Sequence, residues 1–184
     1  GVVFWVGLGA ALIALALVAG RPPKDGEPLS PDGTGPAGAK GLVRLIEELG
    51  ADVRTTNDVP GDDVDVVLLL SDQTTDAQQD ELARWVGDGG TLVVADPAST
   101  FTPVPSGTVD PLGGLVQAST PPGVCTVDAL ADAGRIDARG GLAFETEGSA
   151  GHCYGDEEAA FVVTTSVGGG TIVGVGGAGL FTNE

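Results

Sequence analysis

The sequence predicts an α/β domain built on a mainly parallel sheet that is flanked by helices. Helix-like and strand-like segments follow one another in the order helix, strand, strand, helix, strand, which is typical of sheets with helical crossovers. Both helix-like segments also end at glycine, at Gly50 and at Gly89, as tight connections to a following strand require. The expected class is therefore α/β.

Length and charge limit the architecture and the partners. The 184 residues suffice for one ordinary domain and an anchor. Acidic residues outnumber basic ones by 26 to 8, for a net charge of -18, and such a field repels phosphate backbones, which excludes nucleic acid as a partner. Adaptation to high salt is another source of such an acidic surplus. Gly1 stands where Met is expected, so we expect a piece of a longer protein, truncated at its C-terminus.

The chain begins with an apolar, uncharged segment at residues 2–19. As a helix it would span roughly 27 Å, close to a hydrocarbon core of about 30 Å, and Trp5 would lie near the membrane interface. A cleaved signal peptide is the alternative, but its apolar region typically covers only about 7–15 residues. We therefore expect a single transmembrane helix at 2–19, a linker over 20–35 and the α/β domain over 36–184.

The two cysteines bear on the compartment. Cys125 and Cys153 are the only ones, and neither belongs to a C-x-x-C pair, so a zinc or thioredoxin-type site lacks its spacing. A disulfide in an oxidising compartment is the simplest use of the pair, and two unrelated buried thiols are the alternative. Arg21 and Lys24 after the helix would place the domain in the cytoplasm by the positive-inside rule. That rule compares the charges on both flanks of a helix, and the residues before Gly1 are not part of this sequence. We expect the disulfide and a domain outside the cytoplasm.

The first predicted helix covers residues 36–50. Pro36 suits its first turn and Gly50 suits its end. Its apolar residues recur at positions i, i+3, i+4 and i+7, which predicts a helix packed on a flat surface. They are Leu42, Leu45, Ile46 and Leu49. Residues 51–56 (ADVRTT) alternate between two faces and predict a short strand.

Two further strands and a helix follow. Residues 65–70 (DVVLLL) form a continuous apolar run, which predicts a strand buried on both faces. Thr75 and Gln78 have the spacing of a capping box that opens the next helix. The residues of that helix expected to point inward are Leu82, Trp85 and Val86. Residues 91–95 (TLVVA) predict another buried strand, parallel and adjacent to 65–70 because a short-looped helix connects the two.

The C-terminal part predicts a β-hairpin. Residues 159–166 and 171–175 are strand-like and flank Val167 and three glycines, a sequence typical of a tight turn between antiparallel strands. Between residues 96 and 151 the sequence is rich in Pro and Gly and has only weak periodicity.

Neither cofactor-binding nor catalytic motifs meet their structural requirements. Residues 33–38 match G-x-G-x-x-G, but no strand precedes them and Pro36 lacks the N–H that a pyrophosphate needs. Residues 174–179 match again by chance in a glycine-rich chain. His152 is the only histidine and no G-x-S-x-G elbow occurs. We expect no catalytic residue, no metal ligand and no cofactor, and a structural or surface role for His152.

One candidate site follows from topology. In open α/β sheets, ligands bind at the carboxyl ends of the strands. Ser71 and Asp72 follow the strand at 65–70, and Asp96 follows the strand at 91–95. These three residues are the expected ligand or partner surface, with helix caps and turn formers as the alternative interpretation. Because the chain is so acidic, we expect a protein, a polyol or a cation there rather than a phosphate or nucleotide.

Residues 29–97 resemble the bacterial envelope family called domain of unknown function 4350. The resemblance lies in LSPDGTGPAGAKGLVRLIEELGADVRTT and DVDVVLLLSDQTTDAQQDELARWVGDGGTLVVADP. Cys125, the pair Cys153-Tyr154 and the terminal GGTIVGVGGAGLFTNE resemble the C-terminal half of those proteins. The resemblance implies a single-pass anchor in the cell membrane and an extracytoplasmic domain that is glutamine amidotransferase-like and flavodoxin-like in fold.

The same resemblance bears on function. Class I glutamine amidotransferases carry a nucleophilic Cys on a strand-to-helix elbow, whereas the corresponding positions here, 71–72 and 96–97, hold none. The resemblance therefore implies a non-catalytic relative, which binds a protein or ligand in an envelope complex. Family members are often encoded beside MoxR-type ATPases, which makes such a system a possible partner besides the lipid bilayer. The alternative is an envelope hydrolase or amidotransferase-like enzyme whose catalytic residues lie outside this sequence.

Overall fold

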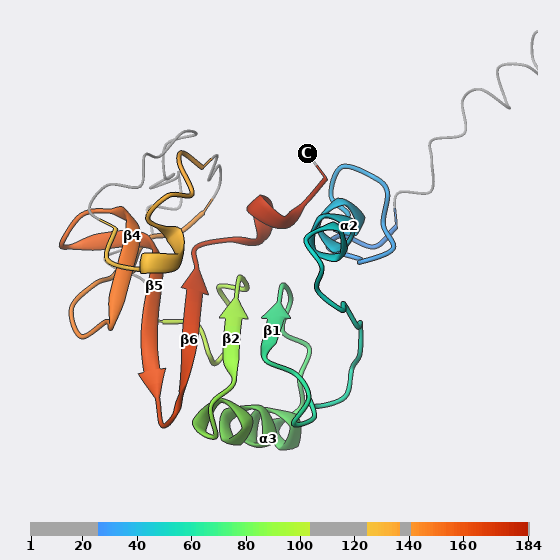
Figure 1. Cartoon of the computed structure of the whole chain (residues 1–184), viewed down its shortest axis with the longest axis horizontal. Helices are drawn as coiled ribbons and strands as arrows, with labels where there is room; N and C mark the ends of the chain where they lie inside the picture. Colours follow the sequence, from blue (N-terminus) through green and yellow to red (C-terminus); the bar gives the residue numbers. More distant parts are fainter. Residues whose placement is uncertain (1–25, 104–124, 137–140, 184) are drawn as a thin grey trace, which may run out of the picture.

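The computed structural model describes residues 26–103, 125–136 and 141–183 (Figure 1). The predicted transmembrane helix at 2–19 lies outside these residues, as does the first part of the predicted linker. Within the described ranges, no helix is long and apolar enough to cross a membrane.

Within the described ranges, the domain has one sheet of six strands and two α-helices. The elements are α2 (Lys40–Glu48), β1 (Val66–Leu69), α3 (Asp76–Gly87), β2 (Thr91–Val94), β3 (Phe144–Glu145), β4 (Gly151–Gly155), β5 (Ala159–Val167) and β6 (Gly170–Val175), with short 3-10 helices η1 (Asp128–Leu130) and η2 (Ala178–Phe181). The strand order is β1-β2-β6-β5-β3, and β4 also pairs with β5. The predicted α/β class is confirmed.

The prediction of a mainly parallel sheet is wrong, because the sheet is mixed. β1, β2 and β6 run parallel to one another, whereas β5 is antiparallel to β6 and to both β3 and β4. The predicted hairpin is the reason. It is confirmed as β5 and β6, joined at the register pair Val167↔Gly170, and it reverses the direction of the chain, so the parallel part of the sheet ends at β6. β3 and β4 were not predicted, since β3 has only two residues and β4 is short and begins and ends with glycine.

The β1–α3–β2 unit forms as its local sequence predicts. The capping box is present, with the Gln78 backbone N–H donating to Thr75 Oγ1 at 3.4 Å and the Thr75 N–H donating to Gln78 Oε1 at 2.9 Å. β1 and β2 are adjacent and parallel, with Leu69 opposite Val94. These two outcomes depend on short-range signals, a cap and a crossover, that the sequence displays directly.

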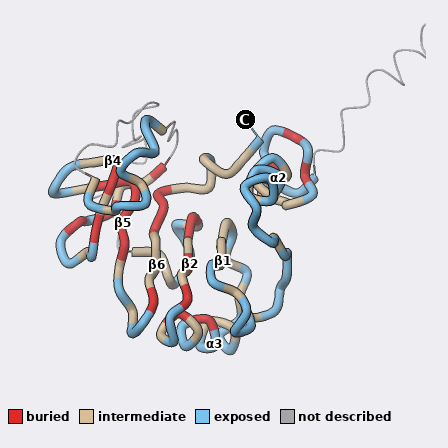
Figure 2. The backbone as a smooth tube through the Cα atoms, viewed as in Figure 1, coloured by how far each residue is buried: buried red, intermediate tan, exposed pale blue. Residues whose placement is uncertain are grey.

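The described residues form three hydrophobic clusters, and the two larger ones lie on the two faces of the sheet. On one face, Leu82 and Val86 of α3 pack against Leu92 and Val94 of β2. On the other face, a larger cluster surrounds the β5–β6 hairpin and the second cysteine. It comprises Ala95, Cys153, Tyr154, Phe161, Val162 and Val175. Figure 2 shows the buried residues concentrated along β2, β4, β5 and β6, so the core lies away from the edge strand β1.

The first helix forms, but the prediction that its apolar stripe packs on a flat surface is wrong. No residue of α2 is buried, and Leu45 and Leu49 are 54% and 79% exposed. α2 lies beyond the carboxyl end of β1 instead of across the sheet (Figure 1). Leu42 and Ile46 are half-buried. The apolar spacing therefore predicted a helix correctly and its burial incorrectly.

The predicted strand at 51–56 does not form, and this changes the environment of β1. The segment is irregular, and Val53 is its only residue that is not exposed. Its Arg54 pairs with the side chains of Asp52 and Asp63, so its polar groups are engaged outside the sheet. β1 is consequently the edge strand with Val66 56% exposed, and the prediction that 65–70 is buried on both faces is wrong.

Candidate functional site

The carboxyl ends of β1 and β2 meet at one edge of the sheet, where the arrows of both strands point in Figure 1. Ser71 and Asp72 follow β1, and Asp96 follows β2. The backbone N–H of Asp72 donates to Asp96 Oδ2 at 2.7 Å, which joins the two loops directly. Ser71 is exposed beside this contact. We call the group Ser71, Asp72 and Asp96 the carboxyl-edge site.

The two carboxylates of the carboxyl-edge site are fixed by hydrogen bonds. Asp72 Oδ1 accepts from the backbone N–H of Thr74 at 3.0 Å and from its hydroxyl. Asp72 Oδ2 accepts from Ser99 Oγ at 2.7 Å, and Asp96 Oδ1 accepts from the N–H of Ala98 at 2.9 Å. The site is therefore a rigid network that holds the loop after β2 against the loop after β1.

These contacts determine the charge state of Asp72. Partial burial acts to raise the pKa of its carboxyl group, but the hydrogen bonds from Thr74, Ser99 and Thr100 together lower that pKa below its ordinary value. A carboxylate that is stabilised as the anion is a poor proton acceptor. Asp72 is therefore suited to hold donors in place rather than to remove a proton.

The arrangement also argues against nucleophilic chemistry at this edge. Ser99 donates to Asp72, but Ser99 is only 7% exposed, and the base that would activate it has a lowered pKa. A serine nucleophile needs both access and a competent base. In the part of the chain that the structure describes, no group of three or more His, Cys, Asp or Glu side chains is placed to hold a metal ion.

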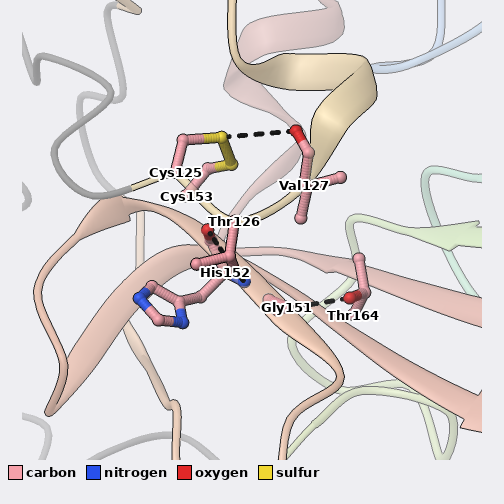
Figure 3. Close-up of a disulfide and its surroundings, with 7 residues drawn as sticks. All are labelled: Cys125, Thr126, Val127, Gly151, His152, Cys153 and Thr164. Atoms are coloured by element: carbon pink, nitrogen blue, oxygen red, sulfur yellow. Dashed lines mark hydrogen bonds between the residues drawn. A yellow bond between two sulfur atoms is a disulfide. The ribbon is translucent and has the colours of Figure 1, made fainter.

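The predicted disulfide is confirmed. Cys125 and Cys153 are bonded, with their Cα atoms 4.2 Å apart (Figure 3). The neighbouring residues continue the link between the two segments, since the Thr126 N–H donates to the His152 carbonyl at 2.8 Å and the His152 N–H donates to Thr126 Oγ1 at 2.9 Å. The disulfide therefore ties the segment that precedes η1 to β4.

A second site, which the sequence did not predict, lies beside this disulfide. It is an open cleft of about 570 Å³ between β4, the β3–β4 loop and the segment after Cys125. We call it the β4 cleft. Its lining consists of Thr126, Thr146, Glu147, Ser149, Ala150, Gly151, His152 and Glu157. The proximity of the only histidine to a cysteine was the one available signal, because the strands that shape the cleft have no periodicity in the sequence.

Comparison with known families matches residues 31–184 to the family described as a domain of unknown function, DUF4350. The chain belongs to this family. No curated protein and no solved structure matches the chain. The match confirms the resemblance noted for residues 29–97 and for the C-terminal half that contains the disulfide and the β5–β6 hairpin.

In this DUF4350 chain the first glycine motif has a structural role. The loop at 33–38 follows no strand, and the Asn183 side-chain amide donates to the carbonyls of Gly33 at 2.9 Å and Gly35 at 2.7 Å. Asn183 Oδ1 also accepts from the N–H of Gly41 at 2.7 Å, which caps α2 from the far end of the chain. The motif therefore anchors the segment around Asn183, a role that the sequence did not predict.

The second glycine motif, residues 174–179, allows close packing. A Cβ on Gly174 would lie 2.6 Å from the ring of Pro103, and one on Gly176 would collide with the carbonyl of Leu142. The motif leads into η2, a four-residue 3-10 helix, rather than into an α-helix whose N-terminus could bind a pyrophosphate.

Proposed function

We propose that this DUF4350 chain is a single-pass membrane protein whose α/β domain lies outside the cytoplasm and binds a partner without catalysing a reaction. The carboxyl-edge site is the proposed contact surface. The observation that carries the proposal is the hydrogen-bond network of Asp72, because its anion is fixed by Thr74 and Ser99 and its pKa is lowered.

Location is argued from two features. The Cys125–Cys153 disulfide is of a kind that persists in oxidising compartments and is rare in the cytosol. The uncharged run at 2–19 has the length of a membrane-spanning helix. An anchor followed by an oxidised domain is the arrangement of an envelope protein.

The charge of the chain favours particular partners. With a net charge of -18, the chain attracts basic surfaces and repels phosphates. A preorganised acidic edge loses little conformational entropy on binding, which favours association with a basic protein surface. Other envelope proteins are the proposed partners, and a MoxR-type ATPase system is the candidate that family association supplies.

The test is affinity purification of the tagged full-length protein from detergent-solubilised membranes. Ser71→Arg introduces a large cation at the exposed position of the carboxyl-edge site, and Glu81→Arg makes a larger charge change on the exposed side of α3. We expect proteins that co-purify with the wild type and with Glu81→Arg to be depleted with Ser71→Arg. Equal recovery with both variants would contradict the carboxyl-edge site as the contact surface.

A further inference from the structure

The exposed apolar side chains of the domain gather on α2. Within the described residues three large apolar side chains are exposed, and two of them, Leu45 and Leu49, belong to the apolar stripe of this helix. They are four positions apart and therefore lie one above the other on the same side of α2. Leu42 and Ile46, on the adjoining part of the stripe, are half-buried. We call Leu45 and Leu49 the open face of α2.

The open face lies close to the point where the described chain begins. Gly26, the first described residue, lies against Gly33, since a Cβ on Gly26 would be 3.3 Å from the Cα of Gly33. The carbonyl of Gly33 accepts from the N–H of Lys40, the first residue of α2, at 3.3 Å. The chain therefore enters the described part of the domain beside the first turn of α2.

The membrane anchor that we propose for residues 2–19 is consequently close to α2. Residues 20–25 separate the anchor from Gly26, and such a stretch spans at most about 25 Å even when fully extended. α3 lies near the other end of β1 and β2 (Figure 1). The anchor thus keeps the α2 end of the domain near the bilayer surface. A short tether gives the open face a high effective concentration at that surface, so a weak contact suffices for docking.

The charge distribution favours the same orientation. Residues 20–49 contain four basic and five acidic side chains, for a net charge of -1. Residues 50–184 contain four basic and 21 acidic side chains, for a net charge of -17. Anionic lipid headgroups repel the second part strongly and the first part hardly at all. The end of the domain that carries α2 is therefore the end that can approach a bilayer.

We propose that the open face of α2 docks on the lipid bilayer beside the anchor, with Leu45 and Leu49 inserted at the boundary between headgroups and acyl chains. The inference rests on the membrane anchor of the proposed function and adds an orientation of the domain to it. A helix with one apolar and one charged side lies in the plane of a membrane interface in this way. The charged side of α2 consists of Lys40, Arg44, Glu47 and Glu48.

The test is fluorescence quenching by phosphatidylcholine that carries bromine near the carbonyl end of its acyl chains. The full chain is reconstituted into vesicles of this lipid and phosphatidylglycerol. Its two tryptophans are Trp5 and Trp85. Trp5 lies within the proposed anchor, so the difference in quenching between the wild type and Trp5→Phe tests the anchor itself. Leu49→Trp, made in the Trp5→Phe background, then reports on the open face after the signal of Trp85 is subtracted.

Ala83→Trp in the same background is the matched control, because position 83 is exposed on α3 and carries the same preference of tryptophan for membranes. We expect quenching of Leu49→Trp to be several-fold stronger than that of Ala83→Trp. Adding Leu45→Glu, which places a charge on the open face, should lower the quenching of Leu49→Trp to the level of the control, since inserting a carboxylate among acyl chains is costly.

Failure of the docking and failure of the anchor give different results. Equal quenching of Leu49→Trp and Ala83→Trp, with Trp5 quenched, would overturn the docking and leave the anchor standing. An unquenched Trp5 would overturn the anchor and the docking with it. Protection of Leu49→Trp from aqueous acrylamide without quenching by the brominated lipid would assign the open face to a protein contact, and it would also overturn docking on the bilayer.

Discussion

Asp72 illustrates how a carboxylate at the end of a strand becomes part of the framework. Its N–H contacts Asp96, and its two oxygens hold Thr74 and Ser99. Topology predicted that Asp72 and Asp96 would share an edge, since parallel strands end on the same side. It did not predict the partner Ser99, which lies in a loop without periodic sequence, so the rigidity of the site emerges only from the structure.

Asp72→Asn should lower the free energy of unfolding at neutral pH by about 1–3 kcal/mol, because charge-assisted hydrogen bonds are lost. The folded-state pKa of Asp72 is lowered, so its stabilising contribution is full above the unfolded-state pKa of about 3.9 and disappears as the pH falls through the folded-state value. The difference between wild type and variant should therefore shrink as the pH falls toward about 3.

Urea denaturation at the two pH values measures this difference. Asp62→Asn, which removes an exposed carboxylate in the turn before β1, is the control and should change stability by less than about 0.5 kcal/mol. A difference for Asp72→Asn that stays constant with pH would contradict the assignment of the ionised network.

The side chain of Asn183 shows how one residue can hold a helix, α2, in place. It accepts from the N–H of Gly41 and donates to the loop carbonyls of Gly33 and Gly35, whereas the N-cap residue Ala39 provides no side-chain cap. Because α2 buries no residue of its own, its attachment depends on these side-chain contacts and on the backbone N–H of Asn183, which donates to the carbonyls of Pro36 at 3.0 Å and Gly38 at 2.9 Å.

Asn183→Ala should therefore loosen the attachment of α2 to the domain while leaving the sheet intact, because it removes the side-chain bonds and keeps the backbone N–H of residue 183. We expect the amides of α2 to exchange with solvent at least about tenfold faster, consistent with the loss of more than one hydrogen bond. Amides of β2 and β6 should keep their protection. Unchanged protection of α2 in hydrogen-exchange measurements would show that other contacts hold the helix.

At the scale of helices and strands, the features that depend on a few neighbouring residues were predicted correctly. The features that depend on contacts across the fold were not. The capping box of α3 and the glycine turn of the β5–β6 hairpin act over a few residues, and both formed as predicted. The burial of α2 and the pairing of residues 51–56 depend on contacts across the fold, and neither occurs. The spacing of apolar residues along the sequence indicates that a helix has an apolar face, but it does not indicate which part of the fold covers that face.

Leu49→Ala and Leu82→Ala compare the two helices. Leu82 of α3 is 4% exposed and packs on the sheet, whereas Leu49 at the end of α2 is 79% exposed. Leu82→Ala should lower the free energy of unfolding by about 2–5 kcal/mol, and Leu49→Ala should change it by less than about 0.5 kcal/mol. Chemical denaturation measures both, and a comparable loss for Leu49→Ala would mean that the face of α2 is covered.

At the scale of the whole molecule, the disulfide links the fold to the cellular compartment, because disulfides persist where the surroundings are oxidising. It joins the segment before η1 to β4 and lies within the larger hydrophobic cluster. The sequence allowed the pairing to be predicted because two cysteines have only one possible partner each. The β4 cleft was not predictable, since its wall combines segments from residues 126 to 157 that only the folded chain brings together.

The placement of the domain outside the cytoplasm is the central claim, because the proposed partners depend on it. The most direct measurement quenches growing cells that express the full chain with acid, and then treats the denatured protein with a polyethylene-glycol maleimide before and after reduction. We predict no alkylation of Cys125 and Cys153 before reduction and alkylation of both afterwards. Alkylation of both cysteines without reduction would show that the pair is reduced in the cell and would contradict the claim.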